Sequence, residues 1–284
     1  MTMATIEVAR YAGACYGVER ALDMAYTAAK DASGPVNTLG PLIHNPLVVQ
    51  DLEREGVSVV DDVEQADSGT VIVRTHGVVP SVVDRARERG LAVVDATCPY
   101  VKKVHHAARR LVSEGFQLVI VGEAGHPEVE GILGAAGGSA LVVQEASELE
   151  SVELSRRVGV VVQTTQTASA LSRVVAAIAP RVSELHVVNT ICEATSERQQ
   201  AARELASSCD CMIVIGGKNS ANTCRLAQIC TEACRNTHHI EDSDEMLSSW
   251  LEGVEHIGVT AGASTPSSHI KRACERLQML LDAR

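Results

Sequence analysis

The sequence predicts an α/β fold built from three similar small units whose sheets are mostly parallel. Apolar, strand-like runs alternate along the chain with amphipathic, helix-like segments. A layout of strand, cysteine and helix occurs three times, and polar loops recur at matched distances after each cysteine. Alternating strands and helices favour parallel sheets that are covered by helices.

Each predicted unit starts at a cysteine that follows an apolar segment and precedes an amphipathic helix. The three leading cysteines are Cys15, Cys98 and Cys192, and the helical segments after them are YGVERALDMAYTAA, PYVKKVHHAARRL and EATSERQQAARELA. The segments that end at the second and third cysteines, LAVVDATC and LHVVNTIC, are the most alike. Separations of 83 and 94 residues suit one small α/β unit each.

A second strand and a polar loop follow each leading cysteine. The loops reach His44, His126 and Ser220, which stand 29, 28 and 28 residues after the cysteine. Each loop opens a predicted helix, at 46–56, 127–136 and 222–236. A short strand comes next, at 57–60, 140–143 and 238–241.

A third strand, a polar loop and a closing helix complete each unit. The loops contain His76, Thr164 and Ser264, and the closing helices begin near Pro80, Ala168 and Pro266. Small drifts in these offsets are what surface insertions produce. We predict units at 15–97, 98–191 and 192–284, the last completed by a strand from residues 1–14.

This topology predicts where a ligand binds. Ligands of parallel α/β sheets bind beyond the carboxyl ends of the strands, and all the leading cysteines and polar loops follow strands. If the units pack about an approximate threefold axis, three thiolates and six polar loops converge on one cavity. We therefore predict one shared site.

Composition and charge exclude several classes of protein. The chain has 45% apolar and 21% charged residues, as an ordinary globular protein does. Its net charge is −11 and it has one Trp, four Tyr and one Phe, which disfavours nucleic-acid binding. It has no apolar run long enough for a membrane span and no signal-peptide pattern. We expect a cytoplasmic protein.

The recurring cysteines indicate a metal centre. A lone cysteine after a strand is usually an inert core residue, but recurrence at one position in three units favours ligation. Three thiolates suit zinc or an iron–sulfur cluster; structural zinc usually takes a fourth protein ligand and close-set cysteine pairs, and neither appears. The other six of the nine cysteines occur in one unit only and are interpreted as core or helix-face residues.

The polar loops indicate an anionic ligand. Imidazole, hydroxyl and amide groups at helix starts suit phosphate oxygens, and glycines let the backbone approach an anion. The candidate groups are His44, His76, His126, Ser220, Asn222 and Ser264, with Gly77, Gly217 and Gly262 beside them.

Glu128 is the candidate acid. A carboxyl two residues after His126, at a helix start that faces the predicted cavity, can relay protons. The simpler alternative is a first-turn Glu that complements the helix dipole. Thr164 lies in a QTTQT run that is unusually polar after three valines.

The motifs in this order resemble the 4-hydroxy-3-methylbut-2-enyl diphosphate reductase family. The resemblance runs from Gly13 to Pro266 and rests on GACYGVERA, IHNPLVV, THGV, DATCPYVKKVH, GHPEVEG, QTT, TICEAT, KNSAN and GVTAGAS. It implies a trefoil-like α/β monomer that takes two electrons and two protons to expel water from an allylic alcohol. The implied products are isopentenyl and dimethylallyl diphosphates, at the last step of the methylerythritol phosphate route.

The resemblance also implies a role for each site residue. Cys15, Cys98 and Cys192 would ligate a [4Fe-4S] cluster with one iron not ligated by protein. His44, His76, Ser220, Ala221, Asn222 and Ser264 would bind the diphosphate. His126, Glu128 and Thr164 would surround the substrate hydroxyl, and Glu128 would be the proton donor. The electron donor would be a ferredoxin or flavodoxin.

Two positions depart from the family pattern, and three alternatives remain. Ala221 stands where the family commonly has a second serine, which removes one diphosphate hydrogen bond or leaves it to a backbone N–H. Ala14 and Tyr16 flank the first cysteine where many members have Phe and Ala. The alternatives are a paralogue acting on another allylic diphosphate, an iron–sulfur sensor, and an anion-binding protein without metal.

Overall fold

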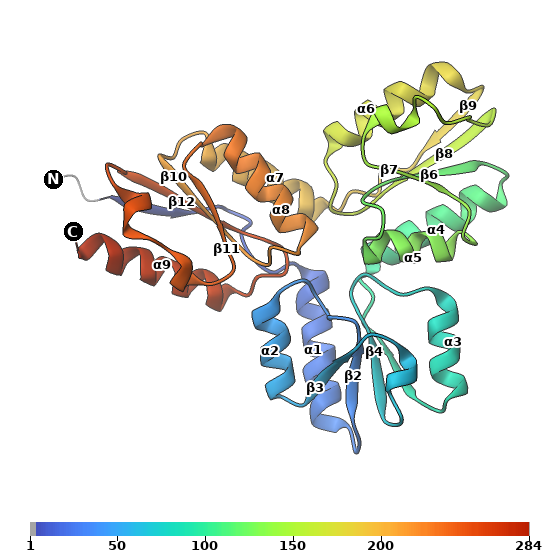
Figure 1. Cartoon of the computed structure of the whole chain (residues 1–284), viewed down its shortest axis with the longest axis horizontal. Coiled ribbons are helices and arrows are strands. Elements are labelled where there is room, and N and C mark those ends of the chain that lie inside the picture. Colours follow the sequence, from blue (N-terminus) through green and yellow to red (C-terminus); the bar gives the residue numbers. More distant parts are fainter. Residues whose placement is uncertain (1–3, 284) are drawn as a thin grey trace. The chain divides into compact units, whose positions relative to one another are not determined.

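The computed structural model describes residues 4–283 and contains three four-stranded sheets in that range (Figure 1). The strand orders are β1-β12-β10-β11, β3-β2-β4-β5 and β7-β6-β8-β9. Every strand pair described is parallel. The α/β class and the three similar units predicted from the sequence are therefore confirmed.

The chain folds into two compact units. Unit 1 comprises the residues up to Glu19, the segment His44–Gln50 and the residues from Glu193 onward. Unit 2 comprises Arg20–Ile43 and Asp51–Cys192, and so contains two of the three sheets. The threefold division at 15–97, 98–191 and 192–284 stays a prediction.

The sheet of unit 1 is covered on both faces. Its strands are β1 (Thr5–Val8), β10 (Cys211–Ile215), β11 (Thr237–Ile240) and β12 (His256–Ala261). Alternate residues of β10 point to opposite faces of the sheet. Ile213 packs against α9 (Ser267–Asp282) on one face. Met212 packs against α7 (Glu193–Ala206) and α8 (Ala221–Ala233) on the other. A strand buried on both faces must be apolar throughout, which explains the unbroken CMIVI run.

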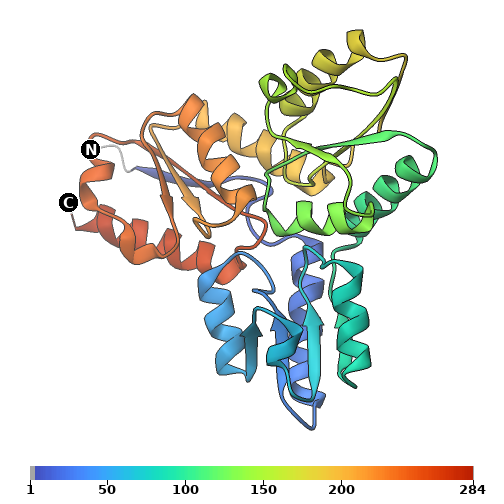
Figure 2. The ribbon, with the colours of Figure 1, turned by 45° about the vertical axis from the view of Figure 1, so that its right-hand side comes forward.

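The first sheet of unit 2 follows helix α1 (Tyr16–Asp31). Figure 2 shows α1 on one side of this sheet and α3 on the other. The core on the α3 side contains Val71 and Val73 of β4 and Ala86 of α3. The further elements are β2 (Val36–Leu39), α2 (Pro46–Arg54), β3 (Val57–Val60), β4 (Thr70–Val73), α3 (Pro80–Glu88) and β5 (Ala92–Asp95).

The second sheet of unit 2 has two helices on one face and one on the other. Leu118 and Ile120 of β6 pack with α4 and α5, whereas Val119 and Val121 pack with α6. The elements are α4 (Pro99–Ser113), β6 (Gln117–Val121), α5 (Pro127–Ala135), β7 (Leu141–Val143), β8 (Arg157–Val162), α6 (Ala168–Ile178) and β9 (Glu184–Val187).

One recurring element was not predicted from the sequence. A short 3-10 helix follows one edge strand of each sheet, after β3 at Val63–Gln65, after β7 at Ala146–Leu149 and after β11 at Ser243–Glu245. Asp62 and Asp242 accept backbone N–H bonds as caps of the first and third of these helices. A carboxylate oxygen satisfies the first N–H groups of such a turn.

Candidate active site

Glu128 lies in the first turn of α5, where the sequence places it next to the end of β8. Pro127 occupies the first helical position, which suits its fixed φ and missing N–H. The Glu128 side chain is buried and accepts two hydrogen bonds from Thr164, from the backbone N at 2.6 Å and from Oγ1 at 2.8 Å. A loop after β8 is thus joined to the start of α5 through one carboxyl.

Burial raises the pKa of the Glu128 carboxyl to about 7, although the two hydrogen bonds from Thr164 act in the opposite direction. Desolvation disfavours the charged form of a carboxyl more than the two donors stabilise it. A carboxyl with a pKa near the working pH can both give and accept a proton. The alternative that Glu128 only complements the helix dipole does not account for its burial, because such a residue would lie at the surface.

His126 is the N-cap of α5, and its Nδ1 accepts a hydrogen bond from the Glu128 backbone N at 3.1 Å. This bond leaves Nε2 as the protonated nitrogen of a neutral ring. The rings of His76 and His126 meet edge to face with their centroids 5.6 Å apart. Four predicted site residues, His76, His126, Glu128 and Thr164, therefore gather at the strand ends of unit 2.

His76 is held by a turn after β4. Gly77 has φ +75°, and its N donates to the Arg74 carbonyl at 3.0 Å. Thr75 bonds through both N and Oγ1 to the Leu42 carbonyl, at 3.1 and 3.0 Å. The positive φ requires glycine at 77, so the THGV motif is in part a backbone requirement.

Each leading cysteine is tied by its backbone to the segment after a neighbouring strand. In unit 2, Cys98 N donates to Thr75 O at 3.0 Å and Cys192 N donates to Thr164 O at 3.1 Å. In unit 1, Cys15 N donates to Ala263 O at 3.1 Å. All three side chains are half-buried, and a helix begins at the next residue in every case. The recurrence inferred from sequence is thus a recurrence of backbone geometry as well.

The other cysteines lie in different surroundings. Burial raises the pKa of the Cys211 and Cys230 thiols to about 12 and that of Cys209 to about 11. Thiols that hold their proton are poor metal ligands. Cys211, Cys230 and Cys234 are buried in the core of unit 1, which agrees with the structural role expected for them.

Unit 1 holds four of the six polar groups predicted to bind an anion, His44, Ser220, Asn222 and Ser264. Ser220 caps α8, and Ala221 and Asn222 are the first two residues of that helix. Asn222 is 5% exposed, and within residues 4–283 neither of its amide atoms has a hydrogen-bond partner. A buried amide without a partner carries a desolvation cost. A ligand oxygen that accepts from Nδ2 would remove part of that cost.

Ser264 and the segment of His44 are joined within the same unit. Ser264 Oγ donates to the His44 carbonyl at 3.2 Å, and Asn45 Nδ2 donates to the Ser264 carbonyl at 2.9 Å. A Cβ at Gly217 would lie 2.6 Å from the His44 carbonyl oxygen. Glycine at 217 therefore permits the loop before α8 to approach the segment that carries His44.

Three buried residues were not among the candidates. Arg198 is 7% exposed and donates to the carbonyls of Gly13 and Ala14, immediately before Cys15. Gln163 is fully buried and its Oε1 accepts from Glu123 N at 2.9 Å. Asn45 was passed over as part of IHNPLVV. An arginine in an alanine-rich helix and a glutamine after three valines were the only sequence signals for the first two.

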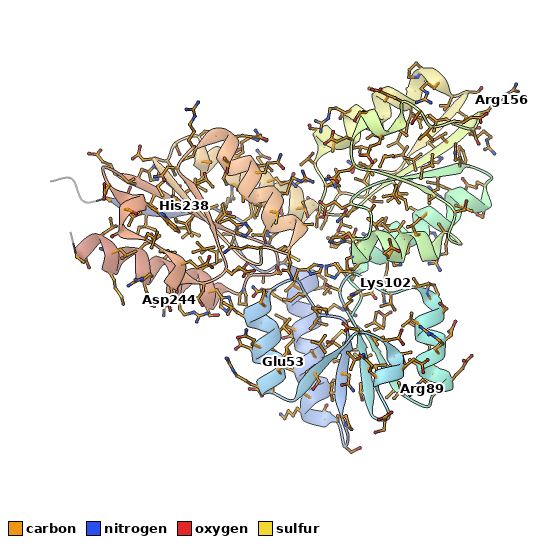
Figure 3. All side chains as sticks on the ribbon, in the orientation of Figure 1. Glu53, Arg89, Lys102, Arg156, His238 and Asp244 are labelled. Atoms are coloured by element: carbon orange, nitrogen blue, oxygen red, sulfur yellow. The ribbon has the colours of Figure 1, made fainter. Side chains whose placement is uncertain are left out.

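A histidine outside the polar loops has a structural role. His238 lies on β11 (Figure 3) and stacks on Trp250 with ring centroids 3.8 Å apart. Its ring also bonds to Asn236 at 2.8 Å. Tyr16, which departs from the family pattern, is 64% exposed at the first position of α1.

Parallel strands that end in polar loops, with a buried carboxyl bonded to a hydroxyl among them, are typical of an α/β enzyme. The sequence profile of the LytB protein family matches residues 6–278. The chain belongs to this family, and it is an oxidoreductase.

The named relatives agree with this assignment. A protein of Geobacter sulfurreducens named 4-hydroxy-3-methylbut-2-enyl diphosphate reductase is 50% identical over 96% of both chains. A solved structure of (E)-4-hydroxy-3-methyl-but-2-enyl diphosphate reductase, described as the terminal enzyme of the non-mevalonate pathway, has 45% identity and a TM-score of 0.73, and the match covers 98% of this chain and 100% of that one. The Plasmodium falciparum E-1-hydroxy-2-methyl-but-2-enyl-4-diphosphate reductase structure has 25% identity and a TM-score of 0.89, with 97% and 87% covered.

None of the helices described between residues 4 and 283 combines the length and apolar character needed to cross a bilayer.

Proposed function

We propose that this chain reduces 4-hydroxy-3-methylbut-2-enyl diphosphate to isopentenyl diphosphate and dimethylallyl diphosphate. The observation that carries the proposal is the buried Glu128 carboxyl, bonded to Thr164 and with its pKa raised to about 7. The names of full-length relatives supply the substrate. In this reading the chain acts at the last step of the methylerythritol phosphate route to isoprenoids.

The reaction consumes two electrons and two protons. The allylic carbon–oxygen bond breaks, one proton leaves with the hydroxyl group as water, and the other forms a new carbon–hydrogen bond. The position of that new bond decides which of the two products forms. The electrons come from a reduced ferredoxin or flavodoxin, which is oxidised.

Glu128 supplies the proton to the departing hydroxyl in this proposal. Hydroxide is a poor leaving group, and protonation lowers the barrier to its departure. A raised pKa of about 7 keeps a proton available on the Glu128 carboxyl near neutral pH. The Thr164 hydroxyl, 2.8 Å from Glu128 Oε2, can pass a proton between the carboxyl and the substrate.

The remaining polar groups fix the substrate. His126 Nε2–H is a donor for the substrate hydroxyl, since its Nδ1 is already engaged by Glu128 N. We assign the diphosphate to His44, His76, Ser220, Asn222 and Ser264, and a backbone N–H at Ala221 replaces the hydroxyl missing there. Asn222 supports this assignment because, in the part of the chain that the structure describes, its buried amide has no protein partner. Holding both ends of the substrate places the hydroxyl before electrons arrive.

We assign Cys15, Cys98 and Cys192 to a [4Fe-4S] cluster with one iron not ligated by protein. The donors fit, because three half-buried thiols each precede a helix, whose first N–H groups favour a thiolate. When bound, the cluster would supply electrons and a Lewis-acidic iron for the hydroxyl oxygen. We expect a cytoplasmic monomer.

The direct test is anaerobic reconstitution with iron and sulfide, followed by an assay of the allylic diphosphate with a chemical reductant. We expect turnover by the wild-type chain and by Glu130→Gln, a control on the exposed face of the same helix. Glu128→Gln should retain the cluster absorbance and lose about 100-fold or more in turnover. A loaded wild-type chain that leaves the substrate untouched would contradict the proposed function, and full turnover by Glu128→Gln would remove that residue from its role.

A further inference from the structure

The ring of His105 fills the space beside two glycines of unit 2. His105 lies on α4, three residues after Lys102, and Figure 3 labels Lys102 on this helix. A Cβ at Gly77 would lie 3.0 Å from His105 Cε1, and a Cβ at Gly131 would lie 3.0 Å from His105 Nε2. A methyl group at either position would therefore require the imidazole to shift by a few tenths of an ångström.

The two glycines belong to segments that carry proposed site residues. Gly77 follows His76 directly, and Gly131 lies on α5 three residues after Glu128. The point where a Gly131 Cβ would stand is also 3.4 Å from the His76 carbonyl oxygen. His105 thus contacts the His76 turn on one side and the Glu128 helix on the other.

Helix α5 has two glycines on the face that packs against α4 and the segment after His76. A Cβ at Gly134 would lie 2.7 Å from Val79 Cγ1. The absence of side chains at Gly131 and Gly134 therefore leaves room for His105 and Val79. Each glycine in a helix costs about 1 kcal/mol relative to alanine. Two of them in a helix of nine residues indicate that close approach is required here.

The His105 ring acts as an uncharged spacer. Burial lowers the pKa of His105 to about 4; Arg109 and Lys102 act in the same direction and Asp95 opposes them. Its buried Nε2 has no hydrogen-bond partner among the residues described. Contact rather than charge or hydrogen bonding therefore holds the ring.

The ring also forms part of the wall of a cavity of about 320 Å³. Gly77, Thr97, Lys102 and Arg109 line the same cavity. Water can therefore enter the space that a smaller side chain at 105 would leave. For this reason we expect His105→Ala to fold.

We propose that His105 is a positioning residue, which sets the separation between the His76 turn and the α5 turn that bears Glu128. The proposal rests on the proposed function, because it concerns how these two residues meet one substrate. A displacement of about 1 Å at reacting groups can cost about 100-fold in rate. A spacer between two such groups should therefore affect turnover more than folding.

The test compares His105→Ala, Gly131→Ala and the double variant with His106→Ala, an exposed neighbour on the same helix. We expect His105→Ala and Gly131→Ala each to lower kcat about tenfold or more. In the double variant the added methyl fills part of the vacated space, so kcat should rise above that of His105→Ala. His106→Ala should match the wild type.

A second measurement needs no turnover. In the full-length chain labelled with ¹⁵N-histidine, His105→Ala should shift the ring signals of His76, whereas His106→Ala should leave them unchanged. A structural role alone would lower Tm without these shifts and without recovery in the double variant. The proposal would be overturned if the losses in kcat of His105→Ala and Gly131→Ala simply multiplied in the double variant. Unchanged His76 signals in His105→Ala would overturn it as well.

The wild-type arm separates the two conclusions. A wild-type chain with no turnover would contradict the proposed function itself. Wild-type turnover that survives intact in His105→Ala would contradict only the positioning role.

Discussion

The carboxyl of Glu128 experiences two opposing effects. Full burial favours the neutral form, while the backbone N and hydroxyl of Thr164 favour the anion. Burial is the larger effect, so the folded-state pKa, about 7, lies above the ordinary value of 4.5. A buried acid that stays neutral can donate a proton near neutral pH, and it makes the fold sensitive to pH.

The raised pKa of Glu128 makes the free energy of unfolding depend on pH in one direction. Below pH 4.5 Glu128 is protonated in both the folded and the unfolded state, and its favourable contribution is fully present. As pH rises from 4.5 through 7 the unfolded state releases its proton first, and the free energy of unfolding falls by about 3 kcal/mol. Glu128→Gln removes this dependence.

We expect Glu128→Gln to gain about 3 kcal/mol of stability relative to the wild type between pH 4.5 and 8. Urea unfolding of both chains at a series of pH values measures the difference. Glu130→Gln, on the exposed side of the helix, should show no comparable gain. If the free energies of unfolding of Glu128→Gln and the wild type differed by the same amount at pH 4.5 and pH 8, burial would not control the pKa of this carboxyl.

At the scale of one element, α7 supports the segment that ends in Cys15. Arg198 reaches from this helix to the Gly13 carbonyl with Nε at 3.0 Å and Nη2 at 2.8 Å, and to the Ala14 carbonyl at 3.1 Å. Its Nη1 also donates to the Ala194 carbonyl at 2.7 Å. A planar guanidinium serves several carbonyls at once, which a lysine ammonium on a flexible stem does not.

Arg198→Lys should therefore lower the free energy of unfolding by about 2 kcal/mol, because buried carbonyls lose donors. Urea unfolding gives the value. Arg203→Lys is the matched control on α7, since the Arg203 side chain makes an exposed ion pair with Glu232 at 3.6 Å. Equal stability of the two variants would mean that the Arg198 bonds do not hold this segment.

The elements differed in how far the sequence predicted them. The strands followed from apolar runs, since a sheet covered on both faces admits few polar residues, as in CMIVI of β10. The 3-10 helices were missed because they are short and acidic, so their residues resemble solvated loops. Arg198 was missed because a charge in an alanine-rich helix usually faces solvent.

The site was predicted by residue type but not by contact. Repetition identified His76, His126 and Thr164 as strand-end residues, and the position of Glu128 after a helix start suggested an acid. The bond between Glu128 and Thr164 joins residues 36 positions apart, and no local pattern encodes it. His105 shows the same limit, because its contacts depend on glycines in two other segments.

At the scale of the whole chain, one arrangement is used three times. In each sheet the strand before a leading cysteine, β1, β5 or β9, is an edge strand paired in parallel with β12, β4 or β8. The cysteine then bonds through its backbone N to the segment after that partner strand. Repetition of the same geometry gives three equivalent thiols in one polypeptide.

The iron content of the anaerobically reconstituted chain tests the central claim, that these three thiols hold one cluster. We expect about four iron atoms per wild-type chain, and the same for Cys224→Ser, whose side chain is exposed on α8. Cys15→Ser, Cys98→Ser and Cys192→Ser should each bind much less iron and lose the brown absorbance. Wild-type iron content in all three of those variants would contradict the claim.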